Sequence, residues 1–245
     1  MIDVHCHILP EVDDGPRSWD VAEEMCRMAS ADGIQHIVAT PHANDRYHYD
    51  REYLSGLLET LRQRIGKFPR FSLGCDFHLS YENFQALMLA PSRYCIEGTQ
   101  YILVELSNYS IPAQVDECLA KMHENGMVPV ITHPERNPIL QQDPERVLRW
   151  REMHCVVQVT ASSITGLWGE RAWRSAQSLL KNEAVHVLAT DAHNNTRRLP
   201  QLSFAREVVE ETYGSEVARA LVEDNPRAIV NGMPLPYFPL PTTRK

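Results

Sequence analysis

Short apolar runs alternate with longer amphipathic segments along almost the whole chain. Seven short runs are candidate strands, and most are continuously apolar, which is typical of parallel strands covered on both faces. They cover residues 2–4, 36–39, 71–74, 101–104, 128–131, 156–159 and 186–189. This rhythm predicts an α/β fold built on a parallel sheet or barrel.

The segments between these runs repeat apolar residues every three or four positions, which predicts helices packed against the strands. The first has Ser18 as a candidate N-cap, and the third has Pro112 in its first turn. The expected helices cover residues 18–33, 54–66, 112–126, 143 onward and 173–180. The tail 234–245 contains four prolines, so we expect it to be irregular.

Length and composition predict one globular domain over residues 1–245, because a chain of 245 residues with 43% hydrophobic residues can bury a large core. Neither a leader-like start nor a run of ~20 apolar residues occurs, so we expect a cytoplasmic protein without membrane insertion. The net charge of −8 argues against nucleic-acid binding. Six cysteines without any CxxC pair argue against disulfides and zinc ribbons, and favour buried packing roles.

The residues able to bind metal ions follow the apolar runs directly. In a βα barrel these positions meet at the C-terminal face of the strands, where such enzymes keep their sites. The candidates are His5, His7, Asp14, His42, Asp76, Glu105, His133, Asp191 and His193. Imidazole and carboxylate ligands without thiolate suit manganese, iron or zinc.

Each of these signals has a structural alternative. Two histidines in HCH can simply end a strand, Glu105 can cap a loop, and DAH is a common turn. Their joint occurrence at successive strand ends favours a metal centre, because independent accidents would seldom produce it. Among the other histidines, His48 and His78 could face the pocket from loops, and the rest are expected in packing or surface roles.

Three arginines lie close to these candidates in sequence. Arg136 belongs to HPER, and Arg197 and Arg198 follow DAHN. One guanidinium group can donate two parallel hydrogen bonds to the oxygens of a phosphate. Of the adjacent residues Arg197 and Arg198, one is expected to be a solvated surface residue. A cysteine phosphatase is excluded, since none of the six cysteines has an arginine six positions further on.

These residues fall within segments that resemble a known superfamily. MIDVHCHILPEVDDGP, VATPH, VELS, VITHPER, ATDAHN and DNPRAIV are similar to the PHP (polymerase and histidinol phosphatase) superfamily. Within it, they most resemble the bacterial protein-tyrosine phosphatases of the CpsB/YwqE type, from residue 1 to about 231. The resemblance implies a distorted (β/α)7 barrel of the TIM-like PHP type that holds three divalent ions, manganese or iron, with zinc or magnesium as alternatives.

The resemblance also implies a distribution of the ligands. One ion would be held by His5, His7, Asp76 and Asp191; a second by Asp76, Glu105 and His133; and the third by Asp14, His42 and His193. Arg136 and Arg198 match the family's phosphate-contacting arginines, with Arg197 as a close rival. The family usually has glutamate where this chain has Asp76, which is one methylene shorter, so bridging by Asp76 is an expectation to be tested.

The function implied is hydrolysis of phosphotyrosine through a metal-bound hydroxide. Three divalent ions would outweigh the four candidate carboxylates by two charges and bring the protein from −8 to about −2, which suits a phosphate substrate. The family context implies that the substrate is the tyrosine-rich tail of a bacterial kinase of capsule or exopolysaccharide synthesis. Two alternatives remain: a PHP phosphoesterase acting on a small metabolite such as histidinol phosphate, and a catalytically silent scaffold.

Overall fold

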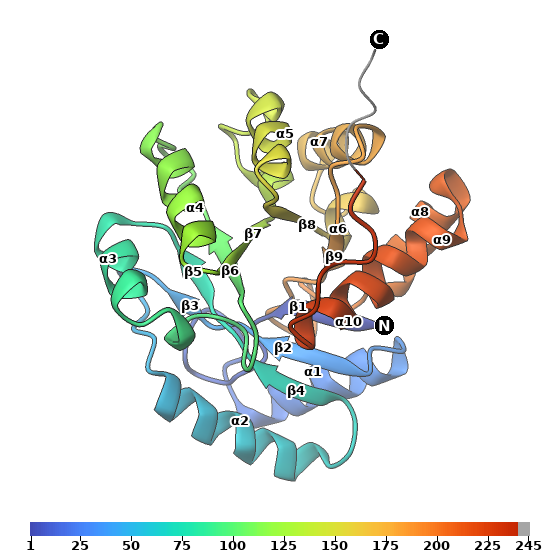
Figure 1. The fold of residues 1–245 in the computed structure, drawn as a ribbon. Helices are drawn as coiled ribbons and strands as arrows, with labels where there is room; N and C mark the ends of the chain where they lie inside the picture. Colours follow the sequence, from blue (N-terminus) through green and yellow to red (C-terminus); the bar gives the residue numbers. More distant parts are fainter. Residues whose placement is uncertain (240–245) are drawn as a thin grey trace.

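The computed structural model describes residues 1–239, in which parallel strands form a ring with helices outside it (Figure 1). Hydrogen bonding joins β1, β2 and β4 in one group and β3, β5, β6, β7, β8 and β9 in another. The strands are β1 (Ile2–Cys6), β2 (His36–Ala39), β3 (His42–Ala43), β4 (Arg70–Leu73), β5 (Asp76–His78), β6 (Tyr101–Glu105), β7 (Val128–Thr132), β8 (Val156–Thr160) and β9 (Val187–Ala189).

Two strand positions of the barrel are interrupted, so nine strands occupy seven positions. Pro41 lacks an N–H and separates β2 from β3, while Gly74 and Cys75 separate β4 from β5. Backbone hydrogen bonds continue across both breaks, from Gly74 N–H to the Ala39 carbonyl (2.8 Å) and from Asp76 N–H to the Pro41 carbonyl (3.1 Å). The expected seven positions are confirmed, but the short strands β3 and β5 were not foreseen.

The barrel closes between its first and last strands. Asp191 donates its N–H to the His5 carbonyl, and His7 donates its N–H to the Ala192 carbonyl, both at 2.8 Å. Beneath this contact, the buried carboxylate of Asp3 accepts hydrogen bonds from the N–H and the hydroxyl of Thr190. The segments that carry His5, His7, Asp191 and His193 therefore lie side by side.

Each strand position is followed by a helix that packs outside the barrel. Ser18 caps the first helix, since its hydroxyl accepts from the N–H of Val21. The helices are α1 (Trp19–Ala31), α2 (Arg51–Ile65), α3 (Tyr81–Leu89), α4 (Gln114–Glu124), α5 (Pro144–Glu152), α6 (Ala161–Ile164), α7 (Glu170–Lys181), α8 (Ser203–Tyr213), α9 (Ser215–Arg219) and α10 (Asn225–Val230), with the short 3-10 helices η1 (Pro91–Arg93) and η2 (Pro134–Arg136) and the π-helix η3 (Ala220–Asp224). The amphipathic pattern predicted α1, α2, α4, α5 and α7 among these helices. Helix α4 begins two residues later than expected, and α3, α6, α8, α9 and α10 were not predicted.

Two apolar clusters stabilise this arrangement. A small cluster fills the barrel and includes Val4, Leu103 and Val130, while Ile229 of α10 packs into the same cluster from outside the ring of strands. A larger cluster lies between the strands and the helices. All six cysteines are free, and five of them are buried, as predicted.

No helix among residues 1–239 combines the length and apolar character needed to cross a membrane. The tail is irregular over residues 234–239, as expected, and its remainder, 240–245, lies outside the described residues.

Candidate metal centre

The nine predicted ligands converge at the C-terminal ends of the strands. Three sets of side chains each bring their ligand atoms within 4.8 Å of one another: His7 with Asp14, His42 and His193; His5 with His7 and Asp76; and His42 with Asp76 and Glu105. The other two candidates adjoin these sets. Asp191 Oδ1 lies 3.4 Å from Nε2 of both His5 and His7, and His133 Nε2 lies 3.9 Å from Glu105 Oε1.

His5 and His7 present their Nε2 atoms to one point, 3.3 Å apart. Both nitrogens face Asp76 Oδ2, at 3.6 and 3.9 Å. The opposite ring nitrogens are held from behind: Nδ1 of His5 lies 2.9 Å from Gln158 Oε1, and Nδ1 of His7 lies 2.7 Å from Asp13 Oδ2. Partners of this kind fix the ring orientation of metal-ligating histidines.

The buried charges shift the pKa values of this group in opposite directions. Burial lowers the pKa of His5, but the carboxylates of Asp76 and Asp191 outweigh it and raise the pKa to about 9. Burial lowers the pKa of His7 to about 4, and the nearby His193 adds to this effect. Burial would raise the pKa of Asp76 and Asp191, but the surrounding cations hold both well below their usual range. The carboxylates of Asp76 and Asp191 are therefore ionised. At neutral pH the imidazole of His5 holds a second proton, whereas that of His7 does not.

Asp14 and His42 connect two of the sets. Asp14 Oδ1 lies 3.3 Å from His42 Nε2 and 3.2 Å from His193 Nε2. The other nitrogen of His42, Nδ1, lies 3.1 Å from Asp76 Oδ2 and 3.8 Å from Glu105 Oε2. The imidazole of His42 therefore belongs to two sets, one with Asp14 and one with Asp76. The family resemblance had implied that His42 binds a single ion.

Two of the candidates adopt left-handed backbone conformations, His133 with φ 34° and Asp191 with φ 49°. This region is sparsely populated by non-glycine residues, and such strain gathers at functional sites. After His133 the chain is held by Glu135, whose buried carboxylate accepts from the Thr160 N–H (3.1 Å) and the Ser163 hydroxyl (2.7 Å). The left-handed residue Asp191 comes two positions after the end of β9, so the chain turns away from the strand between Asp191 and His193.

The donor set fits divalent cations. Both carboxylate oxygens of Asp76 are buried and accept no hydrogen bond within residues 1–239, and Nε2 of His193 makes no hydrogen bond there either. A buried carboxylate that accepts no hydrogen bond is costly, and Asp76 Oδ2 only faces the nitrogens of His5 and His42 at 3.6 and 3.1 Å, so a bound cation among these groups is the natural counterpart. Because the ligands are imidazole and carboxylate with no thiolate, they suit a hard or borderline ion.

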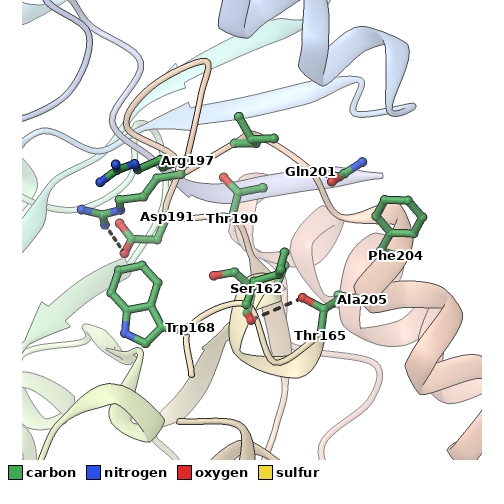
Figure 2. Close-up of a pocket in the computed structure, with 13 residues that line it drawn as sticks. Ser162, Thr165, Trp168, Thr190, Asp191, Arg197, Gln201, Phe204 and Ala205 are labelled. Atoms are coloured by element: carbon green, nitrogen blue, oxygen red, sulfur yellow. Dashed lines mark hydrogen bonds and ion pairs between the residues drawn. The ribbon is translucent and has the colours of Figure 1, made fainter. Parts of the chain in front are cut away.

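The arginines flank the same cluster. Arg136 and Arg198 both contact Oδ2 of Asp191, the latter through Nη2 at 2.5 Å. Arg197 lines the adjoining pocket, but its residue is exposed to solvent (Figure 2). The position of Arg198 therefore agrees better with a phosphate-contacting role than that of Arg197.

Sequence reasoning missed several residues that support the cluster. Asp13 is adjacent to the chosen Asp14, and only the loop conformation distinguishes their roles. Gln158 gave a usable signal, since it is the one polar residue within the apolar run 156–159. His78 had been considered a possible pocket residue, and its Nδ1 lies 3.4 Å from Glu105 Oε2, whereas His48 is exposed. No pattern pointed to Trp168, whose indole lies beside Arg136.

The barrel and its cluster define the class of α/β-barrel hydrolases that hold metal ions at their strand ends. The fold is similar to that of the phosphotriesterase homology protein from Escherichia coli complexed with phosphate, with a TM-score of 0.61, 10% identity, and coverage of 94% of this chain and 98% of that one. At this identity the likeness concerns the fold alone. A family model described as capsular polysaccharide synthesis, CpsB/CapC, matches residues 1–231, and the chain belongs to this family.

Individual relatives agree with this membership. Tyrosine-protein phosphatase YwqE of Bacillus subtilis (strain 168) is 29% identical over 248 residues, covering 100% of this chain and 98% of the relative. Tyrosine-protein phosphatase CpsB of Streptococcus pneumoniae is 26% identical over 249 residues, with coverage of 94% and 98%. A structure from work on YwqE and CpsB, there called unique metal-dependent tyrosine phosphatases, has a TM-score of 0.88 and 30% identity over the whole of both chains.

Proposed function

We infer that the protein is a metal-dependent protein-tyrosine phosphatase. The observation that carries this inference is the buried carboxylate of Asp76, which accepts no hydrogen bond within residues 1–239 although it lies inside a histidine and carboxylate cluster, with Arg136 and Arg198 beside that cluster. The family membership and the names of its relatives support the same activity.

We propose that the cluster holds three divalent ions, manganese or iron, with zinc or magnesium as alternatives. The ligands would be the nine predicted residues: His5, His7, Asp14, His42, Asp76, Glu105, His133, Asp191 and His193. Bound divalent ions polarise phosphoryl oxygens and lower the pKa of a coordinated water from about 15.7 toward ~7, which supplies a nucleophile at neutral pH.

The chain's own residues then bind and orient the phosphoryl group. In the structure Arg136 and Arg198 are paired with Asp191, so their guanidinium groups already lie at the edge of the cluster. We propose that they donate hydrogen bonds to the phosphoryl oxygens, whose negative charge grows during the reaction. A tyrosyl leaving group has a pKa near 10, so its departure needs little help from a general acid.

We further propose that the protein acts in the cytoplasm and that its substrate is a phosphotyrosine protein, namely the tyrosine-rich tail of a bacterial kinase of capsule or exopolysaccharide synthesis. The family description, capsular polysaccharide synthesis, and the tyrosine phosphatase names of the relatives support this assignment.

The test compares hydrolysis of a phosphotyrosine peptide with that of histidinol phosphate by the metal-loaded protein. We expect a clear preference for the peptide, its loss on chelation, and its retention after thiol alkylation. Asp191→Ala should reduce turnover to background with the fold intact, while Asp224→Ala, which removes a carboxylate from a surface ion pair with Arg219, should leave it unchanged. A preference for histidinol phosphate, or turnover that survives complete metal removal, would contradict the proposal.

A further inference from the structure

A partly apolar pocket adjoins the cluster on the side of β9. Arg198, which is paired with Asp191, is one of its lining residues. Figure 2 shows that the pocket extends from Asp191 past Ser162 and Thr190 to Phe204 on α8. Three large apolar side chains line it although solvent reaches them: Leu167 is 81% exposed, Trp168 37% and Phe204 55%. The pocket therefore combines a cationic inner end with an apolar outer part.

Trp168 is the element that links the pocket to the arginines. The Arg136 guanidinium carbon lies 3.7 Å from the centroid of the indole, and that of Arg198 lies 5.3 Å from it. The loop that carries Trp168 contains Gly169 with φ 99°, a conformation that favours glycine. The backbone of Trp168 is fixed by a hydrogen bond to the Ser162 carbonyl at 3.1 Å. The indole is thus held against two cations rather than placed at random on the surface.

A second groove reaches the cluster from the side of β5 and β6, and its charge is opposite. It is lined by Asp45, Glu82 and Glu105 together with His78 and Tyr109, and it has neither lysine nor arginine among its lining residues. A phosphorylated peptide carries a dianion, which this acidic groove repels and the arginine-bearing pocket attracts. Charge therefore favours approach of the phosphoryl group to the cluster through the pocket at Trp168, whose apolar side chains then lie next to the rest of the substrate.

We propose that Trp168, Leu167 and Phe204 form a binding site for the aromatic ring of phosphotyrosine, and that Trp168 is also a positioning residue for Arg136. This inference rests on the proposed function and names the part of the chain that selects an aryl ester. A tyrosyl ring that extends into the pocket from a phosphoryl group beside the arginines meets the indole of Trp168 first, and Phe204 lies further along the same pocket. Aromatic contacts of this kind contribute about 0.5–1.5 kcal/mol beyond burial, whereas a small alkyl ester gains no such contact.

The test uses two phosphonates that share a headgroup but differ in the ring. Benzylphosphonate and methylphosphonate are compared as inhibitors of the metal-loaded protein, with calorimetric binding as a second readout. In Phe204→Ala we expect benzylphosphonate to bind roughly three- to tenfold more weakly and methylphosphonate to bind unchanged. Trp168→Ala should weaken both, because Arg136 loses its support, and Trp168→Phe should restore most of the binding. Tyr109→Ala is the matched control, an exposed aromatic residue of the acidic groove.

The outcomes separate this inference from the proposed function. If Phe204→Ala and Trp168→Ala leave the benzyl preference intact, the ring does not bind here, even when phosphotyrosine is the substrate. If Tyr109→Ala abolishes the preference, the ring lies in the acidic groove instead, which also overturns the assignment. Failure of the wild-type protein to hydrolyse a phosphotyrosine peptide counts against the proposed function, and the phosphonate comparison still tests the pocket. Melting temperatures exclude misfolded variants.

Discussion

Replacement of Asp13 tests the metal centre directly, because Asp13 holds the proposed ligands His7 and His42 in place but is not itself a proposed ligand. Its carboxylate accepts from the Gly15 N–H (2.8 Å) and the His42 N–H (3.2 Å), and its Oδ2 lies 2.7 Å from Nδ1 of His7. Asp13→Asn keeps the size of the side chain but removes its charge. An amide offers one acceptor oxygen and one NH2 group where the carboxylate offers two oxygens, so at least one of these donors loses its partner.

The size of the effect follows from these contacts. Hydrogen bonds to charged groups contribute about 1.5–3 kcal/mol, and loss of such outer partners typically lowers metal affinity or activity by about 10–100-fold. The two estimates agree, because each 1.4 kcal/mol corresponds to about a factor of ten. We therefore expect Asp13→Asn to bind metal about 10–100-fold more weakly, through loss of orientation at His7 and the backbone of His42.

The assay is a metal titration of the demetallated protein followed by calorimetry, with phosphatase activity measured at saturating metal. Asp20→Asn, a substitution in the first turn of α1 at an exposed position, is the control and should leave the affinity unchanged. Wild-type affinity in Asp13→Asn, with an unchanged melting temperature, would refute the view that the carboxylate orients His7.

Two further predictions concern the arginine pair and a buried histidine. Arg198→Ala should lower kcat/KM for a phosphotyrosine peptide by about 100–1000-fold, whereas Arg197→Ala should change it less than about threefold, and equal effects in steady-state kinetics would contradict the assignment. Burial lowers the pKa of His186 to about 3, and its Nδ1 accepts the Val157 N–H. The unfolded chain therefore takes up the extra proton below about pH 6.5, and this site should cost about 2 kcal/mol of stability between pH 7 and 5. His186→Gln should lack this loss in denaturant titrations, and an identical pH profile would disprove it.

The sequence was sufficient to predict the barrel and the gathering of its strand-end side chains. Buried parallel strands leave continuous apolar runs, and in a barrel the residue after each run must face the same end, so positions such as Glu105 and His133 follow from topology alone. The apolar face of each amphipathic helix likewise predicts on which side it packs, as in α1 and α2.

Other features depend on contacts that no local pattern encodes. Strands β3 and β5 are two and three residues long, too short to produce a periodic signal. The choice between Asp13 and Asp14 depends on contacts of Asp13 with His7 and His42. The choice between Arg197 and Arg198 depends on a loop whose N–H groups donate to the side chain of Asn194, and the sequence does not tell which of the two arginines then turns toward Asp191. The left-handed backbone at Asp191 arises where the chain meets β1, a contact across nearly the whole sequence.

The junction of β1 with the segment after β9 gives the protein a thermodynamic link between its first and last strands. His5 and Asp191 lie on opposite sides of this junction with ligand atoms 3.4 Å apart, so a cation held between them would tie together strands that are far apart in sequence. An unfolded chain lacks this pairing and cannot offer the same ligands. Free metal at about 100 times its dissociation constant would therefore add about 2.7 kcal/mol to the free energy of unfolding. The stability of the closed barrel would thus increase with the concentration of free metal.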